Sequence, residues 1–273
     1  MHDVTYTDSL GHAWPFRGAG VDQGDVDELW SHEWDAELGG SSVTSKVRRA
    51  RTVKAVLFLR DMSLADDMLE AFDRDAALGL PGSLEVDGWS RPALVLSAES
   101  EIMGGDAALI TLGVALLERT WSKSHSSHVA PSSDLPVGAD LDYPHGWPHD
   151  WRPVGASAAI EVEAPSPCPV RLTVYGPADS PAVTLAGNRY AVDVDVPAGA
   201  RLVVDGLKRT IVLHRADGTA ANCFAAGERG GGEGSGAYIF EQVPPGPHRA
   251  QWDSTFSFDF EWFEQAGEPR WTR

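Results

Sequence analysis

The pattern of apolar and polar positions divides the chain into a first half that mixes strands with one helix and a second half of short strands. In the first half, residues 51–60 are largely apolar and rich in β-branched side chains, which is typical of a buried strand. Residues 63–77 carry apolar side chains at helical spacing, so we expect a helix there. The apolar positions of this expected helix are Leu64, Met68, Leu69, Phe72 and Ala76.

Residue types at both ends of the expected helix agree with its boundaries. Ser63 is a good N-cap, Asp66 stands in the capping-box position and Asp67 lies in the first turn, where a carboxylate favours the helix dipole. Gly79 and Pro81 follow the last periodic residue and are typical of a helix end.

Three strands follow the expected helix. Residues 83–86 and 89–98 flank the Asp87-Gly88 pair, which favours a two-residue hairpin turn. Pro92 has no backbone N–H to donate, so we expect its strand to lie at a sheet edge or to contain a bulge. A glycine turn then leads into a long apolar strand over residues 107–121. One helix beside an antiparallel sheet makes the first domain, residues 1–123, an α+β domain.

The pattern breaks over residues 122–153, which are rich in Ser, Pro and His and have no periodicity. We therefore expect a linker over residues 124–153. Its last part, YPHGWPHDWRP, is typical of an extended strap lying across a surface. Tyr143, Trp147 and Trp151 are the aromatic residues of this strap and the candidate contacts between the two domains.

Residues 154–273 predict a second domain made of β-strands. Seven or eight short strands without a helical pattern indicate a β-sandwich or jelly roll. The Asp205-Gly206 and Asp217-Gly218 pairs separate β-rich runs, as hairpins require. In the last long strand aromatic and polar residues alternate, which predicts one buried aromatic face. The aromatic positions are Phe256, Phe258, Phe260 and Trp262.

The charge of the chain limits its partners. The chain has 273 residues, a length that suits two domains, and a net charge of −18. Residues 1–153 carry −13 of this charge and the remaining residues −5. Such an acidic chain does not bind nucleic acid through phosphate contacts. On charge alone the acidity favours plain solubility, and the alternative is a wall that repels phosphate and lets nucleic acid pass.

No apolar run approaches the roughly 18 residues of a membrane helix, and the N-terminus carries no secretory pattern. We therefore expect a soluble protein, made and assembled in the cytosol and without membrane insertion. In that compartment Cys168 and Cys223 are expected to be reduced thiols.

No motif predicts catalysis, a cofactor or a metal. His125 and His128, like His145 and His149, have a spacing that suits metal ligands, but no cysteine or further ligand accompanies them. The glycine-rich residues 230–236 are not followed by the Lys-Ser/Thr pair of a phosphate-binding loop. We therefore expect no enzyme activity and no bound cofactor.

A basic cluster stands out in a chain that is short of bases. It consists of Lys46, Arg48, Arg49 and Arg51. One interpretation is a contact between neighbouring subunits, in which this basic patch meets an acidic one. The other is a solvated strand edge that its charges protect from aggregation.

Three stretches of the second half carry a resemblance to a known family. They are PVRLTVYGPADSPAVTLAGNRYAV, ARLVVDGLKRTIVLHRADGTAAN and the closing YIFEQVPPGPHRAQWDSTFSFDFEWFEQAGEPRW. With these stretches the second half resembles the C-terminal, galectin-like domain of the distal tail proteins of long-tailed bacteriophages. Ser180-Pro181 stands where this family usually has Asn-Pro. YPHGWPHDW is similar to the aromatic-proline strap that joins the two domains of the family. The first domain is less similar, and residues 22–40, with Trp30 and Trp34, depart from the family pattern.

This resemblance implies a structural protein of the virion, located at the tail tip. Distal tail proteins form a ring, typically of six subunits, that joins the tail tube to the tail-tip hub. The N-terminal domains make the ring and the channel through which DNA passes without specific binding. The galectin-like domains point outward and hold receptor-binding or side proteins.

Two alternatives remain at this stage. A galectin-like fold does not by itself imply sugar binding, and the residue set of a galactoside site is not found here. A lectin-like module for attachment to host surface glycans is nevertheless the competing interpretation. The equivalent ring component of a phage-tail-like particle is the other.

Overall fold

The computed structural model of the protein describes residues 2–105, 107–131 and 156–271. Their contacts form two compact units, the first made of residues 1–123 and 265–273 and the second of residues 124–264. Strands dominate both units, so the predicted mainly β fold is confirmed. No helix among the described residues is long and apolar enough to cross a membrane.

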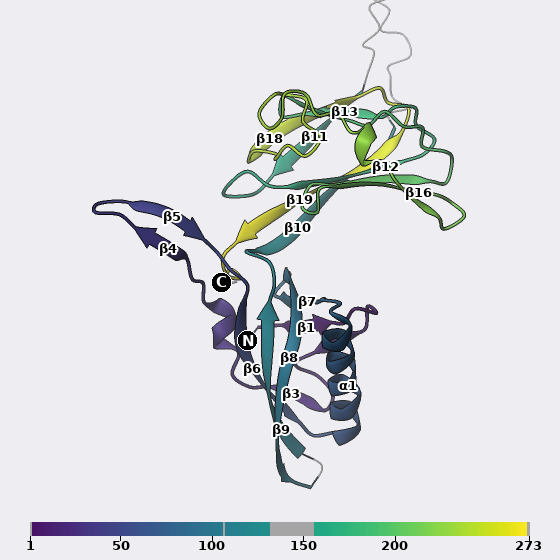
Figure 1. Ribbon diagram of the computed structural model, residues 1–273. Coiled ribbons are helices and arrows are strands. Elements are labelled where there is room, and N and C mark those ends of the chain that lie inside the picture. The colour runs from purple at the N-terminus through teal and green to yellow at the C-terminus, as the bar shows by residue number, and fades with distance from the viewer. Residues whose placement is uncertain (1, 106, 132–155, 272–273) are drawn as a thin grey trace, which may run out of the picture. The chain divides into compact units, whose positions relative to one another are not determined.

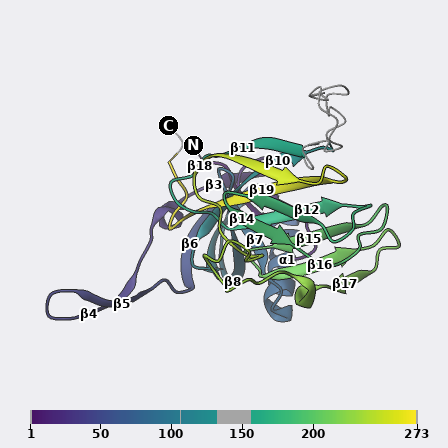
Figure 2. The same ribbon diagram turned by 90° about the horizontal axis from the view of Figure 1, so that it is seen from above.

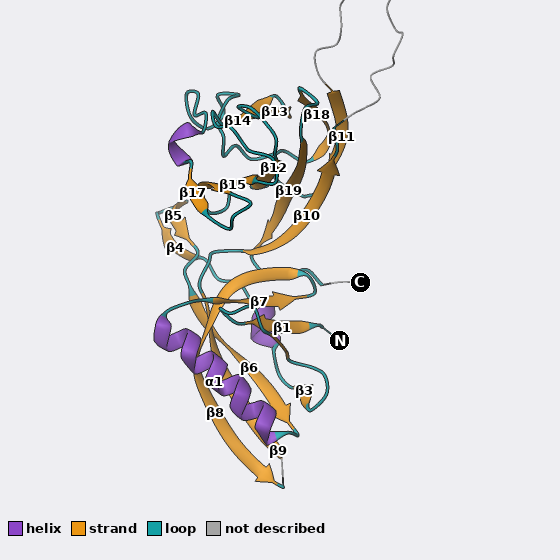
Figure 3. Cartoon of the chain, turned by 90° about the vertical axis from the view of Figure 1, so that its right-hand side faces the viewer, coloured by secondary structure: helices purple, strands orange, loops and turns teal. Residues whose placement is uncertain are grey.

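The first unit is an antiparallel sheet with one α-helix against it. Its strands are hydrogen-bonded in the order β3-β6-β9-β8-β7-β1-β2. Helix α1 lies along the strands β6 and β8, as Figure 3 shows. The strand bounds are β1 Val4–Thr7, β2 Ala13–Pro15, β3 Val21–Gln23, β6 Arg51–Leu59, β7 Gly82–Val86, β8 Trp89–Gly104 and β9 Ala107–Leu116.

Helix α1 spans Met62–Leu78 and ends at Gly79 in a left-handed conformation, as predicted. The prediction that Ser63 is the N-cap is wrong. Asp61 caps the helix, and its carboxylate accepts hydrogen bonds from the backbone N–H groups of Ser63 and Leu64. Because the helix begins before Ser63, Asp66 does not stand in a capping-box position.

The predicted strand over residues 51–60 is confirmed as β6, and the Asp87-Gly88 turn joins β7 to β8 as predicted. Pro92 does not lie at an edge, because it stands opposite Ser83 of β7 within β8. The register of β8 shifts further on, between Val95 and Ser97 and again between Ile102 and Gly104. The apolar run 107–121 is interrupted, since β9 ends at Leu116.

The first residues of the expected linker are not a linker but part of a strand. Residues 124–129 belong to β10, which spans Trp121–Val129 and lies beside β19. Its side chains face carboxylates of β19, as in the contacts of His128 with Asp259 and of His125 with Glu264. These partners lie far along the chain, so a local pattern does not reveal the strand. The strap residues Tyr143, Trp147 and Trp151 lie outside the described residues.

The second unit consists of two packed β-sheets. One sheet has the order β17-β16-β15-β12-β19-β10 and the other the order β11-β18-β13-β14 (Figures 1 and 2). Their bounds are β11 Ala156–Val162, β12 Val170–Tyr175, β13 Ala182–Leu185, β14 Asn188–Ala191, β15 Arg201–Asp205, β16 Thr210–His214, β17 Ala220–Asn222, β18 Gly246–Trp252 and β19 Ser257–Ala266. A short 3₁₀ helix, η2 Phe224–Ala226, follows β17.

The core between these two sheets is rich in aromatic side chains. The predicted alternation of the last strand is confirmed, because Phe256, Phe258, Phe260 and Trp262 are all buried. Tyr190 packs edge-on against Phe260, and its hydroxyl donates a hydrogen bond to the Glu241 carbonyl. Gln265 and the residues after it group with the first unit, so the expected second domain runs too far at its end.

Candidate subunit interface

The first unit contains a two-stranded hairpin that no other strand of the described chain covers. Its strands are β4, Asp35–Leu38, and β5, Val43–Val47, which pair only with each other. Figure 1 and Figure 2 both show this hairpin extending away from the sheet of its unit. We call residues 33–49 the arm. A lone two-stranded hairpin is at best marginally stable in water, so the arm requires support from further contacts.

The sequence favours a hairpin at this place. Residues 39–42 are Gly-Gly-Ser-Ser, and the Gly39 N–H donates to the Ser42 carbonyl to close the turn. The Thr44 hydroxyl donates a second bond, to the Glu37 carbonyl. A bulge follows Glu37, and bulges of this kind twist a strand pair.

Two of the basic residues converge on one aromatic ring at the base of the arm. The guanidinium carbon of Arg48 lies 4.2 Å from the ring centroid of Trp34, and the Lys46 amine lies 5.2 Å from it. Both distances are within the range of a cation–π contact. The exposed fraction of Trp34 is 44%, so its ring remains accessible beside the two cations.

The other two members of the predicted basic cluster point elsewhere. Arg49 makes an exposed ion pair with Asp35, with 2.7 Å between Nε and the carboxylate. Arg51 is directed at the short helix η1, Asp27–Trp30, where it donates to the Ser31 hydroxyl and to the Glu28 and Ser31 carbonyls. Burial lowers the pKa of Arg51, although nearby carboxylates oppose the effect. The structure thus assigns Arg51 a role at the root of the arm.

The arm also exposes apolar side chains that a solvated strand edge does not need. The exposed fraction of Leu38 is 79% and that of Val43 is 56%, and these two residues stand opposite each other in the hairpin. A basic, aromatic and aliphatic surface on a projecting element is typical of a binding surface. This combination favours the contact interpretation of the basic cluster over the protective one.

Sequence reasoning missed Trp34, Leu38 and Val43. The departure of residues 22–40 from the family pattern was the available signal, but a lone tryptophan gives no indication of its partners. Trp34 meets Lys46 and Arg48 only because of the register in which β4 and β5 pair, with Ala36 opposite Lys46. The sequence alone does not give this register.

A second exposed element is the end of the long hairpin formed by β8 and β9. Beyond Val95 the residues of β8 are exposed on both faces, and they include Leu96, Ile102 and Met103. Glu99 and Glu101 lie among them. This hairpin end therefore combines apolar and acidic side chains, in contrast to the basic arm.

Residues weighed for metal binding do not form a site in the described part of the chain. His125 and His128 each face one carboxylate, and no group of three or more His, Cys, Asp or Glu that suits a metal ion occurs there. Cys168 and Cys223 are both free, and burial raises the pKa of Cys168 to about 11. His145 and His149 lie outside the described residues.

Comparison with known proteins gives structural relatives only. No family model and no curated protein matches the sequence. A chain from the phage P2 baseplate in its activated conformation with Ca has a TM-score of 0.61 at 10% identity, covering 98% of this chain and 100% of that chain. The phage p2 baseplate with Sr gives a TM-score of 0.60, also at 10% identity and with the same coverage.

The SPP1 Dit protein, described as a paradigm of hub adsorption apparatus in Gram-positive infecting phages, has a TM-score of 0.49 at 10% identity, with 97% and 99% of the two chains covered. At such low identity the two phage P2 baseplate matches establish the fold and leave the function to be tested. Along nearly its whole length the chain has the fold of a phage baseplate protein, so the resemblance seen in the sequence is confirmed at the level of the fold.

Proposed function

We propose that this chain is a structural protein of a phage tail tip, where it connects the tail tube to the tail-tip hub. The observation that carries the proposal is the likeness to a baseplate chain over 98% of the sequence. Both units contribute to that likeness, so it does not arise from one common β-sandwich alone. In this role the protein works by assembly and needs no catalytic group.

We further propose that about six copies form a closed ring through their first units. The arm of one subunit binds the neighbouring subunit, which covers Leu38 and Val43 and gives the isolated hairpin the support it lacks. A repeated head-to-tail contact of this kind closes into a ring when the rotation between subunits permits it. The bases of the arm then meet a surface of a strongly acidic chain, which favours association in the correct orientation.

The acidity of the first 153 residues fits the wall of a channel for DNA. An acidic wall repels the phosphate backbone and prevents DNA from adhering while it passes. The second units then lie outside the ring, where they hold receptor-binding or side proteins. The equivalent ring of a phage-tail-like particle has the same chemistry and is included in this proposal.

Reconstitution with the neighbouring tail proteins tests the connecting role. The full chain is mixed with the tail tube protein and the hub protein of the same particle, and the products are imaged by negative-stain electron microscopy. We expect rings at one end of the tubes and ring–hub complexes in the absence of tubes. If tube ends stay bare and the chain binds neither protein, the connecting role is wrong.

A further inference from the structure

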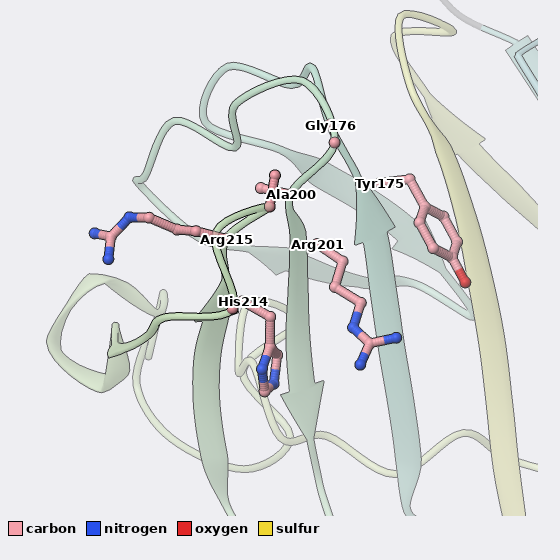
Figure 4. A pocket seen from close by; sticks show the side chains of 9 residues that line it. Tyr175, Gly176, Ala200, Arg201, His214 and Arg215 are labelled. Atoms are coloured by element: carbon pink, nitrogen blue, oxygen red, sulfur yellow. The ribbon is translucent and has the colours of Figure 1, made fainter.

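One face of the larger sheet in the second unit carries an unusual row of polar side chains. Tyr175 of β12 stands opposite Arg201 of β15, and Arg201 stands opposite His214 of β16. Residues paired in this way point to the same face, with their Cβ atoms about 5 Å apart. Figure 4 shows the three side chains side by side, whereas Arg215 points away from them.

This row lies at a hollow in the protein surface. The cavity has a volume of about 530 Å³, within the range of small-molecule sites. Three glycines, Gly176, Gly199 and Gly218, form part of its lining and leave backbone groups accessible. No large aliphatic side chain lines the cavity, so it offers no apolar anchor point of the kind that peptides use.

The two basic side chains of the row have no ion-pair partner in the described part of the protein. Among the described residues, neither Arg201 nor His214 has an ion pair or a side-chain hydrogen bond. Arg171 on the same sheet provides the contrast, because it is paired with both Asp205 and Glu261. A chain with 40 acidic and 22 basic residues thus leaves Arg201 and His214 side by side without an ion-pair partner among the described residues, although the Asp259 carboxylate lies beside Tyr175 at the end of the row.

Facing bases are unfavourable when both are charged, and a bound anion removes that cost. Arg201 has the fork geometry that binds carboxylate or phosphate through two hydrogen bonds. Tyr175 adds a different function, since its hydroxyl donates to Asp259 over 2.5 Å and its oxygen remains able to accept a bond from a ligand hydroxyl. Its ring offers a flat surface for stacking.

We propose that this hollow binds an anionic saccharide, that is, a sugar unit bearing a carboxylate or a phosphate. Arg201 and His214 bind the acidic group, and Tyr175 and the backbone at the glycines bind hydroxyl groups. The proposal does not rest on ring formation, because all of these residues belong to the second unit. Nucleic acid is disfavoured as the ligand by the net charge of −18.

Ligand-observed saturation-transfer NMR and calorimetry on the full chain test the proposal. The probes are D-glucuronate, D-glucose 1-phosphate, neutral D-glucose, inorganic phosphate and a short oligoglutamate peptide. We expect the two acidic sugars to bind more tightly than glucose and more tightly than inorganic phosphate. Arg201→Gln should weaken their binding roughly tenfold or more, the loss that follows from removing a charged bidentate partner. His214→Gln should weaken it severalfold.

Arg249→Gln is the matched control, because Arg249 is an exposed arginine on β18 of the other sheet. It should leave sugar binding unchanged. Circular dichroism of each variant establishes that the fold is retained. The proposal is wrong if none of the acidic sugars binds or if glucose binds equally well. If inorganic phosphate binds as tightly as the acidic sugars, the hollow is a simple anion site and the proposal is wrong. If the oligoglutamate peptide binds more tightly than the sugars, the ligand is an acidic protein segment. If Arg249→Gln weakens sugar binding as much as Arg201→Gln does, the effect comes from the overall charge and not from the hollow.

Discussion

The guanidinium of Arg48 lies over the indole ring of Trp34, 4.2 Å from its centroid, and joins the two strands of the arm at their base. The two residues are separated by the whole hairpin, so this contact closes the arm at its base. Arg51 reinforces the same place through its bonds to Ser31 and Glu28. The base of the arm is thus held by contacts of Trp34, Arg48 and Arg51, whereas its tip is exposed.

Charge reversal on the arm should weaken assembly. Lys46→Glu and Arg49→Glu replace exposed bases with acids on a surface proposed to meet an acidic neighbour. We expect each variant to need roughly tenfold more protein to assemble, which corresponds to about 1.4 kcal/mol per contact. Mass photometry over a concentration series measures this shift.

Arg249→Glu makes the same change of charge in the second unit and should assemble as the unchanged protein does. Added salt should weaken assembly of the unchanged protein as well, because the proposed contact is partly electrostatic. If Lys46→Glu and Arg49→Glu assemble at the same protein concentration as the unchanged protein, the arm is not part of the interface.

The apolar tip of the arm should matter separately from its charge. Leu38→Ser removes a side chain that is 79% exposed in the subunit and buried in the proposed interface. Burying a leucine contributes about 1.5–3 kcal/mol, so assembly should need at least roughly tenfold more protein. Leu10→Ser, at a position that is 75% exposed in the same unit, is the control. Equal effects of the two substitutions would count against a specific role of the tip.

A buried acidic network in the first unit should make its stability depend on pH. Burial alone raises the pKa of Asp8, but hydrogen bonds from the His12 N–H, the Trp14 indole and Arg74 outweigh burial and hold the pKa below 3.8. Ionised Asp8 therefore stabilises the fold above about pH 4, and this contribution is lost as the pH falls through the lowered pKa.

Asp8→Asn should lower the free energy of unfolding by about 1–3 kcal/mol near neutral pH, because Arg74 loses the closer of its two partner carboxylates and keeps only Asp75. At about pH 3 and below the difference from the unchanged protein should shrink, since both side chains are then increasingly neutral. Urea unfolding at the two pH values measures this. A difference that stays constant with pH would show that the charge of Asp8 does not contribute.

The cap of helix α1 provides a test of the corrected helix start. Asp61→Ala removes the acceptor for the N–H groups of Ser63 and Leu64, so the melting temperature should fall by a few degrees. Asp66→Ala, which the sequence alone placed in the capping box, should have little effect because it is exposed and caps nothing. If Asp66→Ala lowers the melting temperature more than Asp61→Ala does, the helix start predicted from the sequence is correct after all.

Local patterns predicted the parts of the fold that depend on local chemistry. The alternating aromatic residues of β19, the Asp87-Gly88 hairpin and the Gly79 helix end were all visible in the sequence. Strand β10 was not, because Ser and His occupy most of its positions and are paired with carboxylates of β19 more than 130 residues away. The pattern therefore resembled that of a linker.

The candidate sites were predicted only in part. The basic cluster was visible in the sequence as four bases in a short stretch. Its members contact different partners, namely Trp34, Asp35 and the helix η1, and which base meets which partner depends on strand register. The row of Tyr175, Arg201 and His214 was not visible at all. Its members come from three strands, and only their pairing in the sheet brings them together.

The central claim is that the protein forms a closed ring, and its mass in solution tests that claim most directly. Light scattering coupled to size exclusion gives the mass of the purified full chain over a range of concentrations, and negative-stain images show its shape. We predict a species of about six times the 29.3 kDa subunit, with a central hole. A strict monomer at every concentration, which also fails to form rings when the tail tube and hub proteins are added, would contradict the account.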